Sequence, residues 1–151
     1  MKFKITDMSE GHIDSIAALE KQCFSMPWSK NSLINELSNV NSHFLVAIDE
    51  NERVLGYIGF NYVCDEGYIT NVAVFQNYRR CGVAKTLLKY IIDFGYKKNL
   101  KFVSLEVRQS NLSAICLYKS LDFVNVGLRK NFYSLPKEDA IIMTKYLRKG
   151  E

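Results

Sequence analysis

Three short runs of β-branched and aromatic residues follow one another between positions 43 and 75. They are HFLVAID at 43–49, RVLGYIGFNYV at 53–63 and GYITNVAVF at 67–75. The turn-forming segments DENE and CDEG lie between them, so the pattern predicts three consecutive antiparallel strands. This meander constrains the fold more than any other part of the sequence.

Helical spacing of apolar residues occurs on both sides of the meander. Segments 8–24 and 26–39 precede it, with Pro27 between them and Ser29 as the predicted N-cap of the second helix. Two further helices are predicted over 83–98 and 111–121. The remaining strands are expected at 2–6, 101–109, 123–133 and 139–148.

The predicted order of elements is β-α-α-β-β-β-α-β-α-β-β. It joins an antiparallel half to one strand-helix-strand crossover, which predicts an α+β (mixed α/β) fold. We expect a central, mixed, mostly antiparallel sheet of about seven strands flanked by four helices. A length of 151 residues with 48% hydrophobic residues predicts a single domain over 1–151.

The four cysteines predict neither disulfides nor a metal centre. Cys23, Cys64, Cys81 and Cys116 stand far apart, without a CxxC pair or other metal-ligand spacing. We expect reduced and mostly buried thiols, and no metal.

Charge and hydropathy bear on location and partners. No run of about 18 apolar residues occurs and the first residues lack the apolar core of a signal peptide, which predicts a cytoplasmic protein without a membrane span. The formal net charge of +4 favours an anionic partner. A nucleic-acid surface, an acidic protein and a phosphorylated cofactor are all anionic partners of this kind.

The segment YRRCGVAKTLL at 78–88 has the layout of an anion site, since a strand leads through two arginines and Gly82 into a helix. Unpaired N–H groups and the helix dipole favour a phosphate at such a helix start. A helix start with solvated basic residues is the alternative. Both GxxxxGK[ST] and GxGxxG are absent, which leaves a pyrophosphate held by another kind of loop.

The loop Arg79-Arg80-Cys81-Gly82-Val83-Ala84 resembles the Arg/Gln-x-x-Gly-x-Gly/Ala loop of the GCN5-related N-acetyltransferases. LEVRQSNLSAICLYKSLDF at 105–123, RKNFYSLPKEDAIIM at 129–143 and MPWS at 26–29 look like the RimI subgroup, the ribosomal-protein-alanine N-acetyltransferases. The resemblance spans nearly the whole chain and implies acetyl-coenzyme A as cosubstrate. The cofactor-binding residues that it implies are Val72, Ala73, Val74, Arg79, Arg80, Cys81, Gly82, Val83, Ala84, Lys85, Asn111 and Tyr118.

Two residues are the candidates for acid–base catalysis. Glu106 points away from Val103 and Leu105 in the strand FVSLEVR, and the resemblance makes it the general base. Without the resemblance, Glu106 is interpreted as an exposed strand glutamate paired with a neighbour such as Arg108 or Lys101. Tyr118 is implied as the general acid for the leaving thiolate, and packing against the core is its alternative role. Asn111 can act as an N-cap, and Val72, Ala73 and Val74 as core residues.

The acceptor is expected to be an amine, and the magnitudes favour an α-amine. An α-amine titrates near pH 7.7–8.0 and a lysine near 10.4, so deprotonating lysine at pH 7 needs about 3.5 kcal/mol more. The subgroup implies a protein N-terminus, that of a small-subunit ribosomal protein with N-terminal alanine. Trp28, Tyr133, Glu138 and Asp139 are candidate acceptor-binding residues, with ordinary surface and turn positions as the alternative.

Other functions remain open from the sequence. They are acetylation of a small amine or a lysine side chain, a noncatalytic acyl-coenzyme A binding module, and a basic RNA-contacting accessory protein. Direct nucleic-acid binding is not expected, because no cluster of basic and aromatic residues occurs outside the loop.

Three positions depart from the family pattern. Gln76 replaces a proline before the loop, which predicts a less rigid approach. Asp122 replaces a glycine, and tolerates a left-handed backbone less well. Cys81 replaces a basic or polar loop residue and adds an oxidation site.

Overall fold

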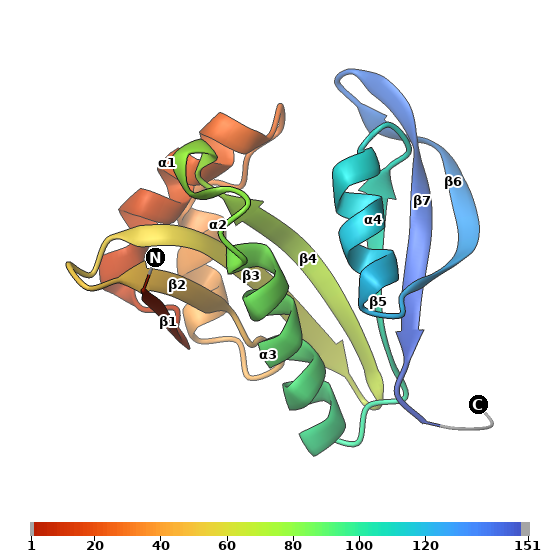
Figure 1. Ribbon diagram of the computed structural model, residues 1–151, viewed down its shortest axis with the longest axis horizontal. Helices are drawn as coiled ribbons and strands as arrows, with labels where there is room; N and C mark the ends of the chain where they lie inside the picture. The colour runs from red at the N-terminus through yellow and green to blue at the C-terminus, as the bar shows by residue number, and fades with distance from the viewer. Residues whose placement is uncertain (1, 149–151) are drawn as a thin grey trace.

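The computed structural model describes residues 2–148, which form one seven-stranded sheet with helices on both faces (Figure 1). Met1 and residues 149–151 of the predicted domain lie outside the described residues. The strands are β1 (Phe3–Asp7), β2 (Leu45–Asp49), β3 (Val54–Val63), β4 (Glu66–Val74), β5 (Phe102–Arg108), β6 (Val124–Ser134) and β7 (Lys137–Tyr146). The α-helices are α1 (Ile13–Cys23), α2 (Lys30–Leu37), α3 (Val83–Lys97) and α4 (Leu112–Ser120), and two 3-10 turns are η1 (Glu10–His12) and η2 (Gln76–Tyr78).

The predicted fold class and the predicted meander are confirmed. The strand order is β1-β2-β3-β4-β5-β7-β6, and every neighbouring pair is antiparallel except β4 and β5. These two strands are joined through α3, so the crossover expected from the sequence is the only parallel pair in residues 2–148. The predicted bounds of α3 and α4 agree to within one residue, whereas α1 and α2 begin five and four residues later than predicted.

The sheet has a separate hydrophobic core on each face. On one face α3 and α4 pack on β-strand residues, with Leu87, Leu88 and Ile91 of α3 fully buried. On the other face α1 and α2 bury Ile16 and Leu33, but this second cluster draws its strand residues only from β2, β3 and β4. That face of β5 and β7 is therefore left open beside α1 and α2.

β4 and β5 pair over three residues only and then diverge. The pairs are Glu66–Phe102, Gly67–Val103 and Tyr68–Ser104. Beyond Tyr68 the register between β3 and β4 shifts, which leaves one extra residue in β4. A β-bulge bends the strand that carries it, so this bulge turns β4 away from β5. Figure 1 shows the resulting V-shaped opening between the two strands.

The helix caps follow the sequence closely. Ser29 Oγ accepts the N–H of Ser32 at the start of α2, and Asn111 Oδ1 accepts the N–H of Ala114 at the start of α4. Each bond satisfies one N–H that has no partner inside its helix. The N-cap role weighed for Asn111 is thus present.

Two expectations about single residues have clear outcomes. Asp122 has a left-handed backbone conformation, which glycine adopts more easily, with φ of 70°. The expectation of mostly buried thiols is wrong, because Cys64, Cys81 and Cys116 are exposed and only Cys23 is partly buried. The exposed thiols lie in turns and on the outer side of α4, where the fold needs no apolar side chain.

In residues 2–148, no helix has the length and apolar character needed to cross a membrane.

Candidate active site

Glu106 lies where β5 leaves β4. It follows the last β4–β5 pair, Tyr68–Ser104, by two residues, so its side chain stands inside the opening of the V. Strand alternation places Leu105 and Val107 in the core below α3 and α4 and turns Glu106 to the other face. Its side chain is 33% exposed. The carboxylate can therefore meet a solvent-borne amine.

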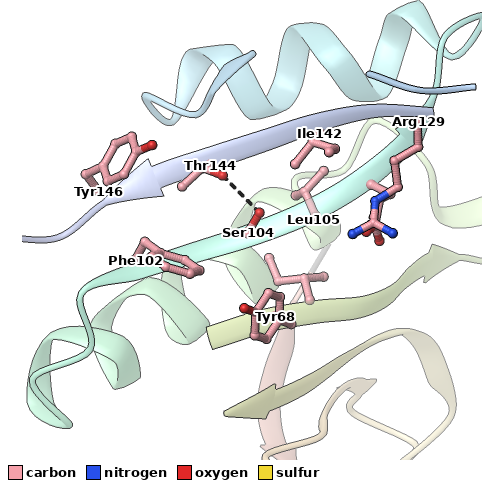
Figure 2. A pocket seen from close by; sticks show the side chains of 10 residues that line it. Tyr68, Phe102, Ser104, Leu105, Arg129, Ile142, Thr144 and Tyr146 are labelled. Carbon is pink, nitrogen blue, oxygen red and sulfur yellow. Dashed lines mark hydrogen bonds and ion pairs between the residues drawn. The ribbon is translucent and has the colours of Figure 1, made fainter. Parts of the chain in front are cut away.

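A hollow of about 290 Å³ lies beside Glu106 on the open face of β5 and β7. Figure 2 shows Tyr146 and Phe102 at one end of it, Ser104 and Thr144 in the middle, and Arg129 at the other end. The Ser104 and Thr144 hydroxyls are 2.9 Å apart and hydrogen-bonded. Its lining residues are Tyr68, Ile69, Phe102, Ser104, Leu105, Glu106, Arg129, Ile142, Thr144 and Tyr146.

The carboxylate of Glu106 is paired with Arg129 of β6, since Arg129 Nε lies 3.4 Å from Glu106 Oε1. The neighbour Arg108, weighed from the sequence as its partner, instead forms a pair with Glu138 at 3.2 Å. The structure thus places a cation against the candidate general base. The Glu106 carboxylate therefore already contacts one positively charged group, and a protonated amine would be a second partner of the same charge.

Tyr118 of α4 has a buried ring and a hydroxyl oxygen that is not fully buried. The residue is 8% exposed, and its ring packs on Phe123 with centroids 5.8 Å apart. Its hydroxyl forms no hydrogen bond within residues 2–148, where every fully buried side-chain oxygen has a partner, so this oxygen is not fully buried. Burial, and then Tyr133, raise the pKa of Tyr118 to about 12. The group is therefore a protonated donor at neutral pH.

The open edge of β4 forms the opposite wall of the V. The N–H of Phe75 donates to the carbonyl of Leu55 on β3. Backbone N–H and C=O groups point to alternate sides along an antiparallel strand, so the N–H and C=O groups of Val74 and Val72 face the opening. Those of Ala73 face β3 by the same alternation, and its side chain is buried below α1 and α2. Unpaired N–H groups on this edge are suited to an oxyanion or an amide-bearing chain.

Arg79 does not extend into solvent. Its Nε donates to the carbonyl of Val74 at 3.2 Å, and one Nη lies 3.5 Å from the sulfur of Cys23. The Cys23 thiol also donates to the Val74 carbonyl at 3.8 Å. Arg79 therefore ties the loop to the end of β4 and to the end of α1.

The rest of the loop is shaped for an anion. Arg80 and Gly82 both have positive φ, at 63° and 82°, and Gly82 is the N-cap of α3. Backbone N–H groups in such alternating conformations form a concave anion site, which the helix dipole reinforces. A Cβ on Gly82 would meet no atom within 4 Å, so the space above the loop is open.

The loop residues that follow Gly82 divide between core and surface. Val83 is buried and fastens the first turn of α3 to the core, and Ala84 is partly buried beside it. Lys85 and Cys81 are exposed. The first three N–H groups of α3 and the nearby cations are therefore open to an anion, as the sequence predicts for this loop.

The candidate acceptor residues lie in two separate segments. Tyr133 is half-buried under the guanidinium of Arg108, which lies 4.2 Å from the ring centroid. Glu138 bonds Arg108 and, at 2.6 Å, the N–H of Ser110; these bonds hold its pKa below the ordinary value. Asp139 Oδ1 accepts the N–H of Asn131 at 2.8 Å. Asp139 therefore joins β7 to β6, whereas Glu138 joins β7 to the end of β5.

Trp28 lies in the segment between α1 and α2, which the structure brings to the β6–β7 turn. Ser25 Oγ donates to the Leu135 carbonyl, and Ser134 Oγ lies 3.3 Å from the sulfur of Met26. This contact spans the open end of the V. It brings Trp28 and Tyr133 to the same side of the sheet as Glu106, although the two segments are over 100 residues apart.

The geometry agrees with a comparison to protein families. Residues 13–123 match the model of the acetyltransferase (GNAT) family, and that span contains the V, the loop, Glu106 and Tyr118. The chain belongs to the GNAT family. It is therefore an acetyltransferase, and acetyltransferases of this family use acetyl-coenzyme A.

Several known proteins are similar over nearly the full length of this GNAT chain. A Haemophilus influenzae protein named ribosomal protein bS18-alanine N-acetyltransferase is 33% identical over 147 residues, covering 95% of this chain and 98% of its own. A Bacillus subtilis protein, to which the same name is given provisionally, is 36% identical over 143 residues. The match covers 94% of each chain. The crystal structure of the ribosomal-protein-S18-alanine N-acetyltransferase from Escherichia coli matches with a TM-score of 0.89 and 27% identity, over 99% of this chain and 97% of its own.

The family assignment confirms the resemblance noted in the sequence and the enzyme class. The roles given to single residues stay predictions. In residues 2–148, no group of three or more His, Cys, Asp or Glu side chains is arranged to hold a metal ion.

Sequence reasoning missed two side chains near the GNAT site. Arg129 begins the segment 129–143 that resembles the subgroup, but its contact with Glu106 gave no signal, because most of β6 is exposed and the β6–β7 register shifts twice. Glu20 did carry one, since it lies four residues after Ile16 on the apolar side of α1. A charged residue on an apolar stripe indicates a buried polar contact.

Proposed function

We propose that this protein moves the acetyl group of acetyl-coenzyme A to the N-terminal α-amine of a protein, namely the N-terminal alanine of a small-subunit ribosomal protein. The observation that carries the proposal is the Glu106 carboxylate in the opening between β4 and β5, on the face left free by the helices. The names of relatives covering over nine-tenths of the chain support the acceptor. A ribosomal acceptor also places the reaction in the cytoplasm.

The proposed reaction is a direct attack. The amine nitrogen forms a bond to the thioester carbonyl carbon, and the carbonyl electrons move to oxygen. A backbone N–H of Val72 or Val74 stabilises that oxyanion. Before the attack, Glu106 takes one proton from the ammonium, directly or through water, so that the neutral amine is the nucleophile. When the oxyanion collapses, the carbon–sulfur bond breaks and Tyr118 protonates the thiolate. The second proton of the nitrogen leaves to water, from which the phenol of Tyr118 is reprotonated. The products are an amide and free coenzyme A.

The loop before α3 is proposed to hold the cosubstrate by its diphosphate. The N–H groups at the start of α3, with Arg80 and Lys85, supply the positive field. Arg79 acts differently in this proposal, because its guanidinium already binds the Val74 carbonyl. It keeps the loop at the end of β4. Asn111, the N-cap of α4, holds Tyr118 on its helix.

A panel of acceptors tests the proposed function. We expect transfer to a peptide that begins with free alanine and copies the start of a small-subunit ribosomal protein. The comparison peptide has the same sequence with an internal lysine, and its N-terminus is already acetylated. We expect its lysine to react at least about 10²-fold more slowly, since the lysine amine is harder to deprotonate. Mass spectrometry locates the acetyl group. Equal or faster acetylation of the lysine, or of a small diamine, would contradict the proposal.

Replacing Gly82 with alanine tests the loop. The left-handed conformation at Gly82 disfavours a Cβ by roughly 1–2 kcal/mol, and the added methyl would project into the open space above the loop. We expect acetyl-coenzyme A to bind about tenfold more weakly, with KM for the acceptor unchanged. Isothermal titration calorimetry measures the affinity. Gly11→Ala is the control, because a Cβ there meets only Ser9 Oγ at 4.0 Å and lies far along the chain from the loop.

A further inference from the structure

A buried carboxylate lies between α1 and the sheet, outside the residues assigned to the reaction. Glu20 is 1% exposed, although it belongs to a residue type that is rarely buried without a partner. Within residues 2–148 no lysine, arginine or histidine forms an ion pair with it. Its burial must therefore be balanced by hydrogen bonds from neutral donors.

Two donors converge on this carboxylate at short distance, and the side-chain amide of Asn71 lies 3.4 Å from Oε2. The backbone N–H of Trp28 donates to Oε1 at 2.8 Å, and the hydroxyl of Tyr57 donates to Oε2 at 2.7 Å. Tyr57 lies on β3 and is fully buried. Burial, followed by the nearby Glu20, raises the pKa of Tyr57, so the phenol stays a donor. Glu20 thus joins β3 to the segment between α1 and α2.

Asn71 of β4 completes the network. The donors and acceptors around its amide orient the nitrogen towards Thr70, at 3.2 Å from the carbonyl and 2.6 Å from Oγ1. The amide oxygen then accepts the indole N–H of Trp28 at 3.2 Å and lies 3.1 Å from the Tyr57 hydroxyl. Both N–H groups of Trp28 therefore end in one buried network, anchored on Glu20 and Asn71.

This network fixes one end of a bridge across the V. Trp28 also packs on Phe44, with ring centroids 5.9 Å apart, while Ser25 and Met26 contact the β6–β7 turn. Asn71 immediately precedes Val72 on the strand that forms one wall of the opening. A shift of Glu20 would consequently move the bridge relative to β4 and Glu106.

We infer that Glu20 is a positioning residue for the acceptor. It holds Trp28, and with it the segment 24–29 that spans the open side of the V, at the place where a polypeptide N-terminus approaches Glu106. The inference rests on the proposed function for the identity of the acceptor. We therefore expect Glu20 to affect the binding of the acceptor and to have no effect on the loop that is proposed to hold the diphosphate.

The experiment compares Glu20→Met with Glu20→Gln in the full chain. Methionine fills a similar volume but accepts no such bond, so the Trp28 N–H loses its partner and the segment moves towards water. We expect KM for the alanine peptide to rise about tenfold, with KM for acetyl-coenzyme A changed less than about twofold. Glutamine keeps one acceptor oxygen and should restore most of the peptide affinity.

Tryptophan fluorescence gives a second measurement without catalysis. Trp28 is the one tryptophan of the chain, so acrylamide quenching reports on this segment alone. Quenching should increase in Glu20→Met and return towards the wild-type value in Glu20→Gln. The matched control is Glu50→Met in the exposed turn between β2 and β3, outside the network. It should leave quenching and peptide KM unchanged.

The outcomes separate this inference from the proposed function. Unchanged quenching in Glu20→Met, or equal rises in KM for both substrates, would overturn the positioning role. A wild-type enzyme that acetylates no peptide N-terminus contradicts the proposed function instead. If Glu20→Met does not fold, Tyr57→Phe replaces it, because it removes one of the two bonds to the carboxylate and should change both readouts in the same direction to a smaller extent.

Discussion

Replacing Glu106 with glutamine is expected to lower kcat/KM for a peptide amine about 10²–10³-fold, while acetyl-coenzyme A binds within about twofold of the wild type. Glutamine preserves the shape of the side chain and can still contact Arg129, but it cannot take a proton. The defect should shrink as pH rises through the acceptor's pKa near 8, because a free amine no longer needs the base. Measuring kcat/KM for the peptide at a series of pH values tests this expectation.

The matched control for Glu106→Gln is Glu50→Gln, in the exposed turn between β2 and β3. It makes the same change of charge far along the chain from the V, and its kinetics should equal those of the wild type. Two results would remove Glu106 from the role of base. One is a loss below about threefold, and the other is a large loss that is constant between pH 6 and pH 10.

Much of the fold was predictable because local patterns and tertiary packing agree. The apolar steps of α3 and the alternation of β5 are visible in the sequence, and each ends where burial ends. Ser29 and Asn111 cap the helices that their positions predict. The opening of the V was not predictable in this way. GYITNVAVF reads as one regular strand, and the bulge before Asn71 exists only through the pairing with β3.

The candidate site was predictable where the chemistry follows from residue type, and not where it depends on contacts. Glu106 stands out as a glutamate on a strand. The partners of the arginines could not be found, because Arg79 bends back to Val74 and Arg129 reaches Glu106 across β7. Neither contact has a fixed spacing in the sequence. The buried position of Glu20 was detectable from helix periodicity, but its partners come from three other segments.

Arg129 gives the base a distinctive environment. Its side chain is 56% exposed and its Nε lies 3.4 Å from the Glu106 carboxylate, so the pair is in contact with solvent. Such pairs contribute little to stability, because water screens them. The contact therefore matters more for the direction in which the carboxylate faces than for holding the fold together. It keeps Glu106 turned towards the hollow in Figure 2, where the acceptor amine is proposed to arrive.

Replacing Tyr118 with phenylalanine is expected to lower kcat about 10²-fold at pH 7, with KM for both substrates changed less than about threefold. Phenylalanine keeps the ring against Phe123, and the lost hydroxyl makes no hydrogen bond within residues 2–148, so Tm should stay close to the wild-type value. The wild-type pKa of about 12 means that the donor is protonated across the usual assay range. Its titration should not limit kcat below about pH 10.

The pH dependence of the Tyr118→Phe defect distinguishes an acid from a packing residue. A thiol titrates near 8.5, so above that pH a leaving thiolate no longer requires a proton and the defect should become smaller. Tyr96→Phe on the exposed side of α3 is the control, and should behave as wild type throughout. A defect of constant size from pH 7 to pH 10, accompanied by a lower Tm, would show that Tyr118 serves packing alone and that the thiolate leaves without its help.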